Sequence, residues 1–201
     1  PEICSLVQYL STSLYQLGVR NGDKVAIISD NMWKWIVTDL AILSLGAADV
    51  PRGSDSTTSE VAYIIKHSDA KVCFAENPTQ ASRIISNLES DSKLESVILL
   101  TGLPEDVTSA IPQNLALYTF DQLIDDGREK YDSLKDKLES IRKNLNEDTL
   151  ATIIYTSGTT GVPKGVMLSH GNILTDIYSM LKVLFPTEKD RWVSVLPVWH
   201  V

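Results

Sequence analysis

The chain has 201 residues, of which 43% are hydrophobic and 22% charged, and these are ordinary proportions for a globular protein with a packed core. A formal net charge of -8, without clustered lysines and arginines, excludes an electrostatic surface for nucleic acid, so no nucleic-acid partner is expected. No apolar run reaches the roughly 18 residues of a membrane-spanning helix. Cys4 and Cys73 lie in apolar segments without a CxxC spacing, and we predict reduced core thiols of a cytosolic protein rather than a disulfide or a zinc site.

Helical and strand patterns alternate over the first hundred residues. Apolar residues at helical spacing end at Gly18 and again at Gly46, where glycine suits the left-handed conformation just beyond a helix. Thr57 and Glu60 have the spacing of a capping box at the start of a third helix, and a fourth helix is expected over 78–88. Short β-branched runs between these helices predict strands over 24–29, 48–50, 71–75 and 96–100. The alternation predicts an α/β fold with a mostly parallel, doubly wound sheet.

Residues 102–148 are more polar and more charged than the segments on either side. Within them, helical patterns are expected over 118–126 and 133–145. We therefore expect this part of the chain to form a peripheral excursion with both helices on the surface.

The chemistry is expected in residues 150–169, LATIIYTSGTTGVPKGVMLS, where two apolar strands, 151–155 and 166–168, flank a loop. The three glycines of this loop let backbone amides approach an anion closely, its hydroxyls add donors, and Lys164 adds a positive charge. A glycine- and threonine-rich hairpin loop without a ligand is the alternative. Pro163 before the lysine and Gly165 after it do not fit the Walker A pattern, so a kinase or GTPase loop is excluded. The loop is predicted to bind a polyphosphate.

Three stretches of the chain resemble one known family. YTSGTTGVPKGV, residues 155–166, resembles the phosphate-binding motif of the adenylate-forming (AMP-binding) superfamily. LAILSLGAADVPRGSD, residues 40–55, resembles an earlier segment of that family, and LPVWHV, residues 196–201, resembles its later P-x-x-H motif. The variant VPRGSDS, residues 50–56, is most similar to bacterial and plastid long-chain fatty acid ligases.

The resemblance implies a place in the family's architecture. Residues 1–201 would form part of the large N-terminal AMP-binding domain, with the first α/β portion in 1–149 and the phosphate loop, a helix and a strand in 150–201. The small C-terminal domain, which carries the lysine that drives adenylation, would be absent. We therefore expect the 201 residues alone to be inactive.

The resemblance also implies a two-step reaction of an AMP-forming acid–thiol ligase. A long-chain fatty acid attacks ATP, with Mg²⁺, to give an acyl-adenylate and pyrophosphate, and coenzyme A then displaces AMP to give a thioester. Acyl carrier protein as the thiol acceptor, a peptide-synthetase adenylation domain or an aryl-acid ligase, and a nucleotide-binding protein without catalysis are the alternatives. A cytoplasmic location is expected, and peripheral contact with the inner face of a membrane is left open.

Roles for single residues follow from the same resemblance. Thr156 and Lys164 would act in catalysis, with Thr156 also near Mg²⁺. The nucleotide-binding residues would be Thr156, Ser157, Gly158, Thr159, Thr160, Gly161, Lys164 and Gly165. His200 would line the substrate pocket near the reacting carboxylate, the alternative being a histidine at a strand end that is satisfied by backbone. His170 is expected to be structural, and His67 to be a surface residue at a helix end.

Overall fold

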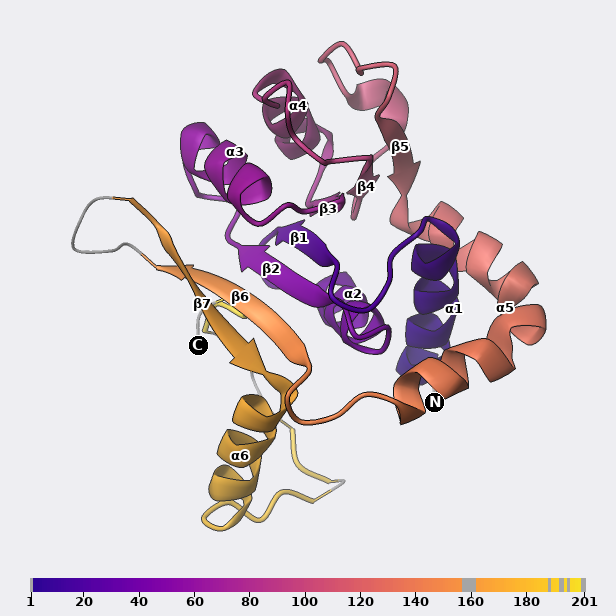
Figure 1. Cartoon of the computed structure of the whole chain (residues 1–201), viewed down its shortest axis with the longest axis vertical. Coiled ribbons are helices and arrows are strands. Elements are labelled where there is room, and N and C mark those ends of the chain that lie inside the picture. Colours follow the sequence, from indigo (N-terminus) through magenta and orange to yellow (C-terminus); the bar gives the residue numbers. More distant parts are fainter. Residues whose placement is uncertain (1, 157–161, 188, 192–193, 195, 200–201) are drawn as a thin grey trace.

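The computed structural model describes residues 2–156, 162–187, 189–191, 194 and 196–199. Helices and strands alternate along most of this part of the chain (Figure 1). Their order is α1 (Glu2–Gln16), β1 (Lys24–Ile28), α2 (Trp33–Leu43), β2 (Ala48–Arg52), α3 (Thr58–His67), β3 (Val72–Ala75), α4 (Pro78–Ser86), β4 (Ser96–Leu99), a 3₁₀ turn η1 (Pro104–Asp106), β5 (Ala116–Thr119), α5 (Phe120–Lys143), β6 (Leu150–Thr156), β7 (Lys164–Ser169) and α6 (His170–Leu181). None of the helices in the described ranges has the length and apolar character needed to cross a bilayer.

The described strands form a seven-stranded sheet in the order β5-β4-β3-β1-β2-β6-β7. The neighbours from β5 to β6 are parallel, and β7 alone runs antiparallel, beside β6. The mostly parallel α/β sheet expected from the alternating pattern is therefore confirmed. β6 extends the same sheet beyond residue 149, and the division of the chain at that residue stays a prediction.

Helices cover both faces of the parallel part of the sheet. Side chains alternate between the two faces of a strand. Val25 and Ile27 of β1 join the core beneath α1, α2 and α5, whereas Ala26 and Ile28 join the core beneath α3 and α4. All four of these side chains are fully buried, and this is the doubly wound arrangement that the sequence predicts.

The expected helix ends are present, but one cap differs. Gly18 and Gly46 have φ values of 90° and 71°, as the left-handed position beyond a helix requires. Thr57 caps α3 through its side-chain oxygen, which accepts from the amide of Glu60. The carboxylate of Glu60 does not return to the cap, because it binds the guanidinium of Arg52 at 2.5 Å instead. The prediction of a reciprocal capping box is therefore wrong in its second half.

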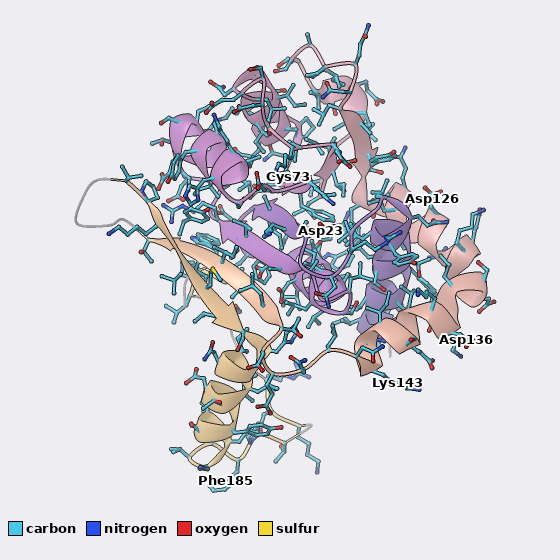
Figure 2. All side chains as sticks on the ribbon, in the orientation of Figure 1. Asp23, Cys73, Asp126, Asp136, Lys143 and Phe185 are labelled. Carbon is cyan, nitrogen blue, oxygen red and sulfur yellow. The ribbon has the colours of Figure 1, made fainter. Side chains whose placement is uncertain are left out.

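The prediction of a peripheral excursion over 102–148 is wrong. Residues 116–119 form the edge strand β5, and residues 120–143 form one continuous helix, α5, in place of two surface helices. A capping box of Thr119 and Gln122 starts α5, and its apolar stripe packs against α1. The outer face of α5 is charged and carries Asp126, Asp136 and Lys143 (Figure 2). Because these charged residues dominate the composition of the segment, composition alone does not indicate the buried stripe. Residues of the stripe with at most 5% exposure are Phe120, Leu123, Ile124 and Leu138.

The two cysteines differ in exposure. Cys73 is buried in β3, near the middle of the molecule (Figure 2), and burial raises the pKa of its thiol. Cys4 is exposed, because the fully buried residues of α1 begin only at Leu10. The prediction of a core thiol is confirmed for Cys73 and wrong for Cys4.

Two carboxyl groups lie close together where α2 packs on β2. Asp49 is 2% exposed, and its Oδ1 has no hydrogen-bond partner among the described residues. Burial raises the pKa of Asp39, on α2, to about 7. Burial, with a further contribution from the nearby Asp39, raises the pKa of Asp49 well above its usual range. The pair therefore destabilises the fold when it is ionised.

This pair predicts a dependence of stability on pH. The unfolded carboxyl groups lose their protons near pH 4, but folded Asp39 retains its proton to about pH 7 and folded Asp49 retains its proton well above the usual range. The free energy of unfolding should therefore fall by roughly 1 to 3 kcal/mol between pH 4 and pH 7. Asp49→Asn should flatten this slope and stabilise the chain above pH 7. Urea unfolding between pH 4 and pH 8 measures both effects, with Asp132→Asn, an exposed carboxyl on α5, as the control. A slope that Asp49→Asn leaves unchanged would contradict the assignment.

The close contact of α5 with α1 predicts a second effect on stability. A Cβ atom at Gly127 would lie 1.9 Å from the carbonyl oxygen of Tyr9, a contact that forces the helices apart. Gly127→Ala should therefore lower the free energy of unfolding by about 1 to 3 kcal/mol, although alanine favours helices. Urea unfolding measures this, and Glu129→Ala, at an exposed position on the same helix, should change it little. Equal stability of the two variants would show that the helices separate without cost.

Candidate functional site

The predicted phosphate loop connects the two antiparallel strands β6 and β7. Thr156 and Lys164 lie opposite each other in the register and form the last described pair before the loop. The two strands expected on either side of the loop are confirmed, and each strand is longer than its apolar run suggests. The other predicted nucleotide-binding residues in this turn lie outside the described residues, and their role stays a prediction: Ser157, Gly158, Thr159, Thr160 and Gly161.

Gly165 has a packing role that its motif does not reveal. It lies opposite Tyr155 within β7, and a Cβ atom there would come 2.7 Å from Cγ2 of Ile153 and 3.3 Å from Cζ of Tyr155. A larger residue at this position would therefore have to displace the side chain of Ile153. Its predicted contact with nucleotide is untested by this geometry.

Lys164 is free to meet a ligand. Its side chain is exposed, and it makes no ion pair with any residue in the described ranges. Thr156, across the ladder, is also exposed. A hydroxyl and an ammonium group are thus presented together at the point where the loop leaves the sheet.

Arg52 links the end of β2 to the start of the loop. Its guanidinium donates to the carbonyl oxygen of Tyr155 at 3.1 Å, to Oγ of Ser56 at 3.0 Å and to a carboxylate oxygen of Glu60. Tyr155 immediately precedes Thr156. Sequence reasoning used Arg52 only as part of the motif VPRGSDS and missed this contact, because its partner lies 103 residues away.

Two aromatic residues of α3 contact the same hairpin. Tyr63 donates from its hydroxyl to the carbonyl oxygen of Pro163 at 3.4 Å, and Nδ1 of His67 lies 2.7 Å from the hydroxyl of Tyr155. Burial, and secondarily the nearby Tyr63, raises the pKa of Tyr155 to about 12, so this phenol keeps its proton at neutral pH and can donate to His67. His67 is exposed at the end of α3 as predicted, but it also has this partner, which the sequence did not indicate.

The segment before His200 lies at the same edge of the sheet. The side chain of Asn31, just after β1, donates to the carbonyl oxygen of Leu196 at 2.8 Å and accepts from the amide of Val198 at 3.0 Å. The ring of Trp199 occupies the space above Gly53, just after β2, where a Cβ atom would come 2.6 Å from Cζ2. Thr156, Asn31 and Gly53 therefore all lie at the carboxyl ends of parallel strands, where open α/β sheets bind ligands.

His200 itself lies outside the described residues, so its role in the substrate pocket stays a prediction. The same holds for the strand expected after α6, because most of residues 192–196 lie outside them too. The contacts of Asn31 and Gly53 involve Leu196, Val198 and Trp199, and Trp199 directly precedes His200 in the sequence. They were not found from the sequence, since neither residue belongs to a pattern that points to residues 196–199.

His170 opens α6 and is held by its backbone. Ser169 caps this helix in a box with Asn172, and the amide of His170 donates to the carbonyl oxygen of Thr149 at 2.9 Å. Burial lowers the pKa of His170, and its buried Nε2 has no hydrogen-bond partner among the described residues. These contacts support the structural role expected for it.

The described residues near the loop offer Mg²⁺ one oxygen ligand, the hydroxyl of Thr156. No group of three or more histidine, cysteine, aspartate or glutamate side chains in the described part of the chain could hold a metal ion. The exposed hydroxyl of Thr156 is an oxygen donor of the kind that Mg²⁺ accepts. Mg²⁺ in such sites is commonly held by few protein ligands together with substrate phosphates, so one hydroxyl beside a phosphate loop is compatible with it.

The comparison with known proteins decides the family. Residues 2–201 match the family described as AMP-binding enzyme. The chain belongs to this family. The resemblance noted in its sequence motifs is thereby confirmed.

Relatives of this chain are named as fatty acid ligases. The chain is 35% identical over 189 residues to the chloroplastic long-chain-fatty-acid–[acyl-carrier-protein] ligase AEE15 of Arabidopsis thaliana, covering 92% of this chain and 26% of that protein. It is 31% identical over 207 residues to the human long-chain-fatty-acid–CoA ligase ACSBG2, covering 100% of this chain and 30% of that protein. The chain thus spans between a quarter and a third of these relatives.

A solved structure shares the fold of this chain. The crystal structure of a long-chain-fatty-acid-CoA ligase (FadD1) from Archaeoglobus fulgidus superposes with a TM-score of 0.76 and 22% identity. The match covers 99% of this chain and 35% of that chain. The arrangement of strands and helices is therefore that of the N-terminal part of adenylate-forming enzymes.

The contacts of Asn31 give a prediction for the site. Asn31→Ala removes both hydrogen bonds to the segment before His200, so amide hydrogen exchange across residues 196–199 should become about threefold to tenfold faster. Exchange followed by mass spectrometry measures this. Asn114→Ala, at an exposed position remote from the carboxyl edge of the sheet, is the matched control. Wild-type exchange rates in Asn31→Ala would show that the segment is held by other contacts.

Proposed function

We propose that the complete protein containing this chain is an AMP-forming acid–thiol ligase that activates a long-chain fatty acid with ATP. The observation that carries the proposal is the hairpin of β6 and β7, which presents Thr156 and Lys164 side by side where the glycine- and threonine-rich loop begins. Membership of the AMP-binding enzyme family and the names of the relatives support it.

The loop and its stems suit the adenylation step. When a carboxylate attacks the α-phosphorus of ATP, negative charge develops on the departing pyrophosphate. Lys164 supplies an exposed positive charge for it, and Thr156 supplies a hydroxyl for a phosphate oxygen or for Mg²⁺. When bound, Mg²⁺ would add further neutralisation of the phosphate charge. Donors held in advance at this position stabilise the transition state more than the ground state.

Residues 196–199, at the carboxyl edge of the sheet, lead to the proposed binding region for the acid. Trp199 packs over Gly53 at the carboxyl edge of the sheet. We propose that the next residue in the sequence, His200, contributes to the pocket for the acid. A carboxylate bound near His200 would then lie on the same edge as the phosphates held by Thr156 and Lys164. Long-chain fatty acids are the proposed substrates because both named relatives act on them.

Coenzyme A is the proposed thiol acceptor, as in the name of the human relative. Acyl carrier protein is the second candidate, because the plant relative with 35% identity is named for it. Incubation of the acyl-adenylate with equal concentrations of coenzyme A and of phosphopantetheinylated acyl carrier protein separates the two. The faster thioester identifies the acceptor.

The role of Lys164 gives a prediction for the two half-reactions. In the complete protein, Lys164→Ala should lower fatty-acid-dependent exchange of pyrophosphate into ATP by about 10- to 1,000-fold, because the charge on the leaving pyrophosphate loses a partner. Thioester formation from supplied acyl-adenylate should be largely retained. Lys182→Ala, which removes an exposed lysine just beyond α6, should leave both steps unchanged.

Two outcomes would contradict the proposal. Equal loss of both half-reactions in Lys164→Ala would remove its assigned role in adenylation. If the wild-type protein with Mg²⁺ gave no hydroxamate from fatty acids of several chain lengths, ligase activity would be excluded. Thermal stabilisation by ATP in that second case would identify a nucleotide-binding protein without catalysis.

A further inference from the structure

We propose that Arg52, Tyr63 and His67 are positioning residues that hold the two stems of the phosphate loop, which rests on the function proposed above for that loop. Each of them contacts a residue at one end of the loop, Tyr155 or Pro163, and none of them belongs to the loop motif. They come from β2 and α3, elements buried in the rest of the fold.

Arg52 fixes the first stem through its backbone. β2 and β6 pair at Asp49 and Thr152, so Arg52 lies beside Tyr155, three residues further along each strand. The guanidinium is fixed by Ser56 and Glu60, and its Nη1 donates to the carbonyl oxygen of Tyr155. That carbonyl belongs to the peptide that leads into Thr156. Its orientation therefore sets the direction in which Thr156 leaves the strand.

Tyr63 contacts the second stem through one longer hydrogen bond, of 3.4 Å. Its hydroxyl donates to the carbonyl oxygen of Pro163, which belongs to the peptide that leads into Lys164. The two side chains expected to act on phosphate, Thr156 and Lys164, are thus each attached to a peptide that is held from outside the hairpin. A planar peptide with its carbonyl fixed has little freedom to reorient the next residue.

His67 completes the contact between α3 and the hairpin. Tyr63 and His67 lie four residues apart, on one face of the helix, and their rings stack with centroids 5.1 Å apart. The ring of Tyr155 meets both edge-on, at 6.4 Å and 5.7 Å, and its hydroxyl reaches Nδ1 of His67. These three rings hold α3 against the side-chain face of β6, so Tyr63 is itself placed by the contact.

The support behind these residues is rigid. The inner face of α3 is buried in the core through Val61, Ile64 and Ile65, none more than 2% exposed. A catalytic group held by well-packed neighbours is already placed when charge develops on the substrate. The cost of ordering the loop stems is therefore met during folding rather than in each turnover.

The test uses the complete protein and three variants. Tyr63→Phe removes one hydroxyl, and Arg52→Lys keeps the charge but loses the forked geometry. We expect kcat for adenylation to fall about threefold in Tyr63→Phe and about 10- to 100-fold in Arg52→Lys, with thioester formation from supplied acyl-adenylate unchanged. Lys66→Ala, on the same helix but paired with Glu89 and Asp91 away from the hairpin, should match the wild type.

A second measurement separates this inference from the proposed function. Amide hydrogen exchange over residues 153–156 and 163–166 should be faster in both variants and unchanged in Lys66→Ala, whether or not the protein turns over. If the wild-type protein catalysed no adenylation, the proposed ligase function would be refuted. Faster exchange at the stems in Tyr63→Phe and Arg52→Lys would still support the anchoring of the stems by these residues. Wild-type exchange at both stems, or equal loss of the two half-reactions with faster exchange throughout the fold, would overturn the positioning role.

Discussion

Parallel pairing of β6 with β2 is the constraint on which the candidate site depends. The chain leaves the sheet at the β5 edge and returns through α5 to the opposite side of β1, so residues about a hundred positions apart in sequence become neighbours. The register places Arg52 beside Tyr155. A shift of one residue would turn Ile153 and Tyr155 away from the core beneath α3, so burial of these side chains also fixes where the loop begins.

The alternating elements could be read from the sequence because each of them carries a local signal. Gly18 and Gly46 end helices because glycine adopts the left-handed conformation without steric cost. Short β-branched runs such as 24–28 are typical of buried strands in a parallel sheet. Over residues 116–143 the sequence indicated two helices and no strand, because the buried stripe of α5 is narrow and Gly127 resembles a helix break. Its role becomes visible only once Tyr9 of α1 is known to lie against it.

The candidate site was predictable from the sequence only where it rests on a local pattern. The loop between two apolar strands, with Lys164 after proline, is a local pattern and its stems were found. Arg52, Tyr63 and Asn31 were not, because each acts on a carbonyl or amide of a distant segment, and a backbone group has no sequence signature. Glu60 illustrates the limit well: its spacing from Thr57 indicates a cap, yet the charge of Arg52 competes for the carboxylate and wins.

The packing of Gly165 against Ile153 has a consequence for tracing descent in this family. A descendant that lost its catalytic chemistry but kept the hairpin would still be under selection to keep this glycine, since a Cβ atom at this position would crowd the side chains of Ile153 and Tyr155. Retention of the glycine therefore says little about whether such a descendant is still an enzyme. Lys164, exposed and without a structural partner among the described residues, has no comparable reason to persist, and its loss would be the earlier mark of decay.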